Sequence, residues 1–121
     1  MHEIIFYADS RGKSQILEYI RHLAKSKGKD SRIKLNKIQD YIQALSVYGA
    51  SQLSEVYAKH LDGEIWELRP LRDRIVFVGW VNSSFVLLHQ FMKKTQKTPS
   101  REIEQAKREI ADLKERGLNH E

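Results

Sequence analysis

The sequence predicts an α+β domain, in which an antiparallel β-sheet is flanked by an N-terminal helical hairpin and a C-terminal helix. Three observations predict it. Apolar residues recur at helical spacing before residue 50 and after residue 100, and residues 56–92 are rich in the β-branched and aromatic residues typical of strands. Short turns separate the three strands expected there, and such turns join antiparallel strands. The length of 121 residues suits one domain, residues 1–121.

The N-terminal part is predicted to be mostly helical. Glu3–Tyr7 suits a short strand, and Asp9 or Ser10 can cap the helix that follows. The turn Lys27–Lys29 separates this helix from a second one that ends near Gly49, which gives an antiparallel hairpin. The apolar stripes of the two helices are Ile16, Leu17, Ile20, Leu23 and Ala24, and then Leu35, Ile38, Ile42 and Leu45.

Three strands and a final helix are predicted in the rest of the chain. The strands are Glu64–Arg69, Arg74–Val81 and Phe85–Phe91, and turn residues separate them. Thr98 is the expected cap of the final helix, and Pro99 suits its first position. The apolar stripe of this helix is Ile103, Ala106, Ile110 and Leu113, and Gly117 closes it.

The composition limits the classes of function. The net charge is +5 and the pI is about 9.5, and a basic small domain attracts polyanions, of which nucleic acid is the commonest. No stretch approaches the roughly 20 apolar residues of a membrane helix, and the N-terminus lacks the pattern of a signal peptide. The absence of cysteine excludes disulfides and thiolate chemistry and is compatible with a reducing compartment. We therefore expect a cytoplasmic protein without a membrane partner.

Cationic side chains gather at one edge of the predicted sheet. Arg69, Arg72 and Arg74 bracket the turn between the first two strands. In a meander the end of the third strand returns to the edge where that turn lies, so His89 and Lys93 are expected beside the arginines. Further basic residues lie just after the third strand and just before the first: Lys94 and Lys97, and Lys59 and His60.

This set of residues suits the cleavage of an RNA phosphodiester. Fixed guanidinium groups stabilise the charge that builds on phosphorus when the 2′-hydroxyl attacks, and histidine can transfer a proton near neutral pH. This route requires no metal and no other cofactor, and the five histidines lack the spacing of metal ligands. The catalytic candidates are Arg74, His89, Lys93 and Arg69, and the RNA-binding candidates are Arg72, Lys94, Lys97, Lys59 and His60.

Other interpretations of the same residues stay open. The arginines can form surface ion pairs with nearby acids, His89 can be a hydrogen-bonded structural residue, and the lysines can belong to a solvated loop. A non-catalytic RNA- or ribosome-binding module would use the same basic edge, and a subunit that binds a protein partner is a third alternative. The sequence contains neither a glycine-rich phosphate loop nor a Gly-x-Ser-x-Gly elbow.

Several segments together form a recognisable pattern: Asp62–Arg69, Asp73–Phe77, Leu87–Pro99, and then Glu102, Ile103 and Ala106. They resemble the HigB-like, phage-derived branch of the RelE toxin superfamily. The resemblance covers about residues 61–108, and the run from His89 to Pro99 is its specific part. Glu64 and Glu67 depart from the pattern, because RelE itself has lysines at these strand positions.

The resemblance implies a RelE-like fold and a function. Members of this family are toxins of type II toxin–antitoxin pairs, and they cleave mRNA in the decoding site of the translating ribosome. A small helix-turn-helix antitoxin neutralises them, and the complex represses its own operon through the antitoxin's contact with operator DNA. By position, Arg74 matches the arginine that the superfamily places at the scissile phosphate. Lys93 and Lys94 match the basic residues after the last strand, and His89 falls in the histidine-containing strand.

Overall fold

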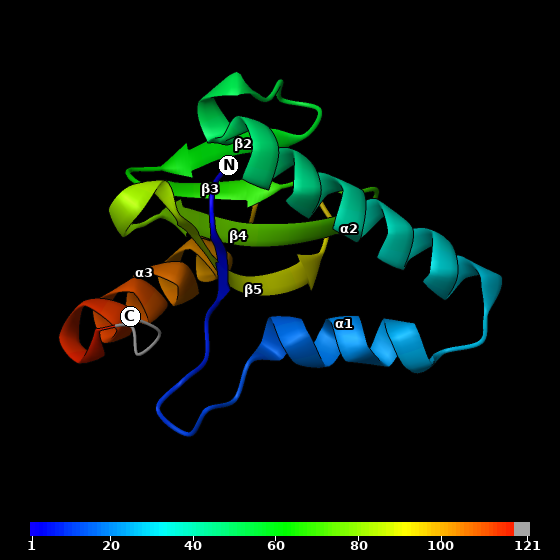
Figure 1. Ribbon diagram of the computed structural model, residues 1–121, viewed down its shortest axis with the longest axis horizontal. Helices are drawn as coiled ribbons and strands as arrows, with labels where there is room; N and C mark the ends of the chain where they lie inside the picture. The colour runs from blue at the N-terminus through cyan, green and yellow to red at the C-terminus, as the bar shows by residue number, and fades with distance from the viewer. Residues whose placement is uncertain (118–121) are drawn as a thin grey trace.

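The computed structural model describes residues 1–117 as a five-stranded sheet with helices on both faces (Figure 1). The strands are β1 (Ile4–Phe6), β2 (Ala58–Asp62), β3 (Ile65–Leu68), β4 (Asp73–Gly79) and β5 (Phe85–Met92), in the order β1-β5-β4-β3-β2. The helices are α1 (Gln15–Lys25), α2 (Lys29–Tyr48) and α3 (Ser100–Arg116), with two short 3-10 helices, η1 (Ala50–Gln52) and η2 (Val81–Ser83). The predicted α+β class, with a helical hairpin before the sheet and a helix after it, is confirmed.

The sheet is mixed rather than wholly antiparallel. Strands β2 to β5 form an antiparallel meander, but β1 pairs in parallel with β5, so that Ile4 lies opposite Phe85 and Phe6 opposite Leu87. Parallel strands need a long connection, which the hairpin and the first strands of the meander supply here. The predicted antiparallel arrangement of the three central strands is therefore confirmed, and β1 adds a parallel pair at this edge, because its direction depends on the path of the whole chain.

The structure contains a strand, β2, that is not one of the three strands predicted from the periodicity. Lys59 and His60 in its middle are both exposed, so the segment lacks the apolar alternation of a half-buried strand. It nevertheless pairs antiparallel with β3, and Lys59 lies opposite Glu67. Charged residues on an exposed edge are typical of natural sheets, because they discourage pairing with other chains.

The helix α1 begins later than the predicted caps indicate. Ser14, and not Asp9 or Ser10, is its N-cap, and the Ser14 hydroxyl accepts a hydrogen bond from the N–H of Leu17. Asp9 instead accepts a hydrogen bond from the N–H of Arg11 and closes the turn before the helix. The second helix of the hairpin ends at Gly49 as predicted.

The helix α3 is fastened at its C-terminal end to the segment that follows β1. Pro99 is its N-cap rather than its first residue. Asp112 accepts a hydrogen bond from the Tyr7 hydroxyl at 2.7 Å and forms an ion pair with Arg116 at 2.6 Å. Hydrogen bonds from Arg116 and Tyr7 lower the pKa of Asp112 to about 2. This network holds the end of α3 beside the edge strand β1.

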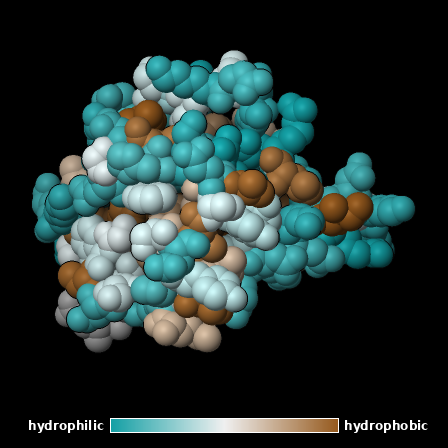
Figure 2. Space-filling view, turned by 90° about the horizontal axis from the view of Figure 1, so that it is seen from above, coloured by the Kyte–Doolittle hydropathy of each residue, from teal (hydrophilic) through white to brown (hydrophobic). Residues whose placement is uncertain are grey.

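Two apolar clusters fill the two sides of the sheet. Successive side chains of β3 and β4 point to opposite faces of the sheet, so both faces carry apolar side chains. The hairpin covers one of these faces and α3 covers the other. In Figure 1, α1 and α2 meet at a turn on the side of the molecule opposite α3. Figure 2 shows that the tip of this hairpin projects from the body and is mainly hydrophilic. Within residues 1–117, no helix is both long enough and apolar enough to cross a membrane.

Candidate active site

Arg74 is a buried cation at the start of β4. Its side chain is fixed by two hydrogen bonds, in which Nη1 donates to the carbonyls of Leu71 at 2.9 Å and Asp73 at 2.8 Å. Its Nε lies 3.8 Å from Glu67 Oε2, and the residue is 6% exposed. Burial lowers the pKa of Arg74, and the negative charge of Glu67 opposes that shift. Because a guanidinium stays protonated in proteins, the result is a positive charge held in one place.

The residue before Arg74 anchors the start of the strand to the helical hairpin. The Asp73 carboxylate is fully buried and accepts hydrogen bonds from the Tyr19 hydroxyl at 2.7 Å and from Gln90 Nε2 at 2.8 Å. Burial and the contact with Asp73 raise the pKa of Tyr19, so its hydroxyl remains a proton donor. These contacts fix the backbone from which Arg74 projects to the opposite face.

Glu67 is the acid of this site, although it is not among the site residues predicted from the sequence. It lies on β3, is 2% exposed and faces the same side of the sheet as Arg74. Its Oε2 lies 3.6 Å from Arg69 Nε and 3.8 Å from Arg74 Nε, and its Oε1 accepts a hydrogen bond from the Thr98 hydroxyl at 2.8 Å. The available signal was a single charged residue within the apolar run of the strand, Ile65 to Leu68.

Arg69 and Arg72 extend the cationic surface along the turn between β3 and β4. Arg69 Nη1 donates to the carbonyl of Glu55 at 3.0 Å, and its Nε is buried without a hydrogen-bond partner within residues 1–117. Arg72 is exposed, and its Nη2 donates to the carbonyl of Lys93 at 3.2 Å. Arg69 Nε faces the Glu67 carboxylate as an ion-pair partner, so its charge belongs to the same cluster as that of Arg74.

The segment from Lys93 to Pro99, called the 93–99 segment below, lies over Glu67 and Arg74. Together with Phe91 it encloses a cavity of about 10 Å³ above these two side chains. Lys94 and Lys97 are exposed, and Lys93 is half-buried. Within residues 1–117, none of these three lysines forms an ion pair, so their charges are available to a ligand.

His89 lies on the same face of the sheet as Arg74, but deeper, beneath α3. It is 2% exposed, and both ring nitrogens contact carboxylates: Nδ1 lies 2.7 Å from Glu109 Oε1, and Nε2 lies 3.0 Å from Glu102 Oε1. Each ring nitrogen therefore lies within hydrogen-bond distance of a carboxylate on α3. The ring therefore links β5 to the first turns of α3, and it does not line the small cavity.

A β-bulge decides which way His89 faces. The register of β4 and β5 shifts so that Val76 pairs with His89 and Phe77 with Leu87, which leaves Leu88 as the extra residue. Leu88 and His89 consequently both face α3. Without the bulge, His89 would face the helical hairpin.

The remaining candidates lie on β2, on opposite faces of the sheet. Lys59 lies opposite Glu67 and is exposed beside the site. His60 packs its ring against Trp66 and its Nε2 lies 2.6 Å from the Gly63 carbonyl. The structure thus brings Arg69, Arg72, Arg74 and the 93–99 segment together around Glu67, with Lys59 at the rim. His60 faces away from them, since consecutive strand residues alternate.

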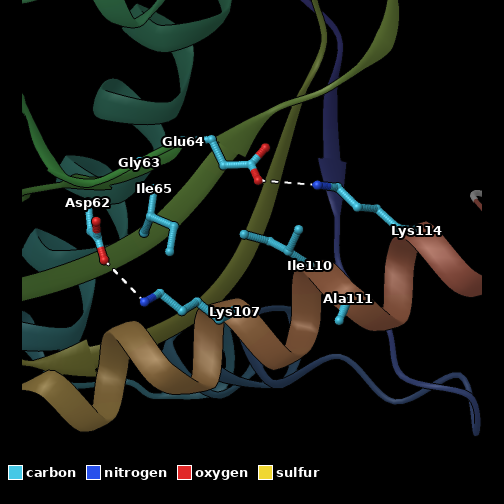
Figure 3. Close-up of a pocket in the computed structure, with 8 residues that line it drawn as sticks. All are labelled: Asp62, Gly63, Glu64, Ile65, Lys107, Ile110, Ala111 and Lys114. Carbon is cyan, nitrogen blue, oxygen red and sulfur yellow. Dashed lines mark hydrogen bonds and ion pairs between the residues drawn. The ribbon is translucent and has the colours of Figure 1, made fainter.

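A second hollow, of about 330 Å³, lies between the β2–β3 turn and α3 (Figure 3). Two exposed ion pairs span it, Asp62 with Lys107 at 3.3 Å and Glu64 with Lys114 at 3.4 Å. Ile65 forms part of its lining. None of the predicted site residues lines this hollow, so its charged residues serve as controls for those of the site.

The arrangement around Glu67 can bind an anion and accept a proton. Two fixed guanidinium groups and a set of unpaired lysines favour a phosphate group, and the carboxylate can act as a base. Within residues 1–117, no group of three His, Cys, Asp or Glu side chains is placed to hold a metal ion.

Comparison with known proteins places most of the chain in one family. Residues 14–111 match the family model described as phage derived protein Gp49-like. The match includes the hairpin, strands β2 to β5 and most of α3, and so it contains every residue described above for the site. A search of curated proteins finds no match.

Proposed function

Since the chain belongs to the Gp49-like family of phage-derived proteins, a RelE-like toxin family, we propose that it is the toxin of a type II toxin–antitoxin pair. The proposed activity is that of an endoribonuclease of the HigB type, which cleaves mRNA on the translating ribosome without a metal. The single observation that carries this proposal is the buried Glu67 carboxylate held between Arg69 and Arg74. A base beside two fixed cations is what the attack of a 2′-hydroxyl on its own phosphate needs.

The proposed reaction assigns a role to each group of the site. Glu67 accepts the proton of the 2′-hydroxyl, whose oxygen then bonds to phosphorus. Arg74 and Arg69 stabilise the negative charge that builds on the phosphoryl oxygens. The bond to the 5′-oxygen breaks, and this oxygen takes a proton from the Lys93 ammonium group. The products are a 2′,3′-cyclic phosphate and a free 5′-hydroxyl.

His89 has a positioning role in this scheme. Its two ring nitrogens are occupied by Glu102 and Glu109, and its burial separates it from a ligand in the small cavity. By linking β5 to α3, it holds the C-terminal end of the 93–99 segment in place. Proton transfer to the leaving group is therefore assigned to Lys93 and not to His89.

The exposed cations of the site are proposed to bind the RNA backbone. They surround the site and come from the β3–β4 turn, the 93–99 segment and β2, namely Arg72, Lys94, Lys97 and Lys59, whereas His60, on the opposite face of the sheet, is left out of this set. Each phosphate that such a residue neutralises releases counterions, which makes binding dependent on salt.

The salt dependence gives a direct test of two of these contacts. In the double variant Lys94→Ala/Lys97→Ala, the slope of log K against log salt concentration for a short single-stranded RNA should fall by about 1.4, because each phosphate contact contributes about 0.7. The matched control is Lys107→Ala/Lys114→Ala, which removes the same charge from the hollow shown in Figure 3. Equal slopes for the two double variants would mean that Lys94 and Lys97 do not contact the RNA and that the RNA-binding surface lies outside the 93–99 segment.

The proposed partner is a small helix-turn-helix antitoxin. Its complex with this chain would bind operator DNA through the antitoxin, and both proteins would act in the cytoplasm. A net charge of +5 favours a partner with an acidic segment that covers part of the basic surface.

The function as a whole is tested by expression in bacteria. We expect induction of the wild-type chain to arrest growth and to produce new mRNA ends that primer extension maps to translated regions. Purified protein and ribosomes should yield the same cuts when the protein has been treated with EDTA before Mg²⁺ is restored for the ribosome. Growth arrest without mRNA cuts would support the alternative, a non-catalytic module that binds RNA or the ribosome.

A further inference from the structure

The 93–99 segment closes the site in this structure. The cavity that it forms with Phe91 over Glu67 and Arg74 measures about 10 Å³. That volume corresponds to about one water molecule and is too small for a phosphate group. A phosphodiester can reach both side chains only if the segment moves.

Thr98 is the side chain that fastens the segment to the sheet. Its hydroxyl donates to Glu67 Oε1 at 2.8 Å, while Glu67 Oε2 faces the two arginines. The other hydroxyl of the segment, on Thr95, donates to the Lys97 carbonyl within the segment itself. Within residues 1–117, the lysines of the segment form no ion pair. The hydrogen bond from Thr98 to Glu67 is therefore the polar contact by which a side chain of the segment is held to the site.

Both ends of the segment are fixed. At the start, the Lys93 N–H donates to the Arg72 carbonyl at 2.8 Å, and Arg72 Nη2 donates back to the Lys93 carbonyl at 3.2 Å. At the far end, the Glu102 N–H donates to the Pro99 carbonyl at 3.0 Å, and the Glu102 side chain contacts His89. A movement that opens the cavity is therefore confined to residues 94–98.

We propose that the 93–99 segment is a cover that Thr98 holds closed, and that it lifts to admit the phosphodiester. When the cover lifts, the Thr98 hydroxyl leaves Glu67 Oε1. This carboxylate oxygen then accepts the proton of the 2′-hydroxyl. Thr98 is thus a positioning residue that keeps the base occupied until substrate is bound. This inference rests on the proposed function, because it concerns access to the same site.

The test compares Thr98→Val, which has the same shape without the hydroxyl, with Thr98→Ser, which keeps it. The probe is a short RNA with 2′-O-methyl groups, which binds but has no 2′-hydroxyl to attack phosphorus. A hydrogen bond to a charged group is worth a factor of about ten or more, and affinity rises with the fraction of open molecules. We expect Thr98→Val to bind the probe about tenfold more tightly than wild type and Thr98→Ser to bind like wild type.

A second measurement reports on the segment itself. Backbone ¹⁵N order parameters for residues 94–98 should fall from about 0.85 to below about 0.6 in Thr98→Val, and not in Thr98→Ser. A merely structural threonine would weaken binding when replaced, whereas a cover predicts tighter binding. Probe affinity in Thr98→Val at or below that of Thr98→Ser, or unchanged order parameters, would overturn the proposal.

A third measurement keeps the proposal testable if Thr98→Val does not fold. The chain has no cysteine, so Gln96→Cys provides one labelling site for a fluorophore on the segment. The methylated RNA should change its fluorescence when it binds, and binding without any change would contradict a moving cover. If the cover opens in these assays but no form of the protein cleaves RNA, the proposed function fails and the cover stands.

Discussion

Arg74→Ala is expected to abolish toxicity and to lower the rate of mRNA cleavage by a factor of about 100 to 1,000. This factor corresponds to about 3–4 kcal/mol, the typical cost of removing one fixed donor that stabilises a developing negative charge. The expectation rests on the burial of Arg74 and on the carbonyls of Leu71 and Asp73, which hold its guanidinium in place before substrate arrives. A surface ion pair would instead cost about 0–1 kcal/mol of stability and no activity.

The fold should survive this substitution. Glu67 keeps Arg69 as an ion-pair partner. The carbonyls of Leu71 and Asp73 lose their hydrogen-bond donor, and this loss should lower the free energy of unfolding by about 1–3 kcal/mol. Circular dichroism and denaturant unfolding measure this loss, while primer extension measures cleavage. Arg74→Lys separates charge from geometry, since lysine keeps the charge but lacks the planar set of donors, and it should restore a small part of the activity.

Arg21→Ala is the matched control for Arg74. Arg21 is exposed on α1, and within residues 1–117 it forms no ion pair. Its replacement removes the same charge and should leave both growth arrest and cleavage unchanged. A folded Arg74→Ala protein that cuts mRNA as fast as wild type would place the site elsewhere.

Glu67→Gln is expected to lower the cleavage rate by a factor of about 100 to 10,000, the usual contribution of a general base. The amide keeps the shape of the side chain and an oxygen that can accept the Thr98 hydrogen bond, but it cannot take a proton. RNA binding should persist, because the arginines and lysines are unchanged. Single-turnover cleavage and the affinity for methylated RNA separate the two effects.

Glu64→Gln is the control for this substitution. Glu64 precedes β3, is exposed, and pairs with Lys114 across the hollow in Figure 3. Its loss should not change cleavage. If Glu67→Gln fails to fold because two guanidinium groups lose their anion, Glu67→Asp keeps the charge with a shorter reach and should show a reduced rate with normal stability. Wild-type rates in both Glu67 variants would remove Glu67 from the reaction.

The local pattern of the sequence was sufficient for the three α-helices, for the strands other than β2, and for one edge of the site. The apolar stripe of α3 is buried as predicted at Ala106, Ile110 and Leu113, because a helix with one apolar face has one way to cover a sheet. The arginines of the β3–β4 turn meet Lys93 because antiparallel neighbours bring the end of β5 beside that turn. Such arrangements follow from residues close in sequence or from the geometry of a meander.

The tertiary structure alone decided the depth and the direction of the functional side chains. Glu67 resembles a surface acid in the sequence, and it is buried because Thr98, 31 residues away, closes over it. His89 faces α3 because one extra residue in β5 changes the face on which it lies, and alternation along a strand cannot reveal such a bulge. The parallel pairing of β1 likewise depends on the whole intervening chain. Contacts of this kind join segments far apart in sequence, so no local pattern encodes them.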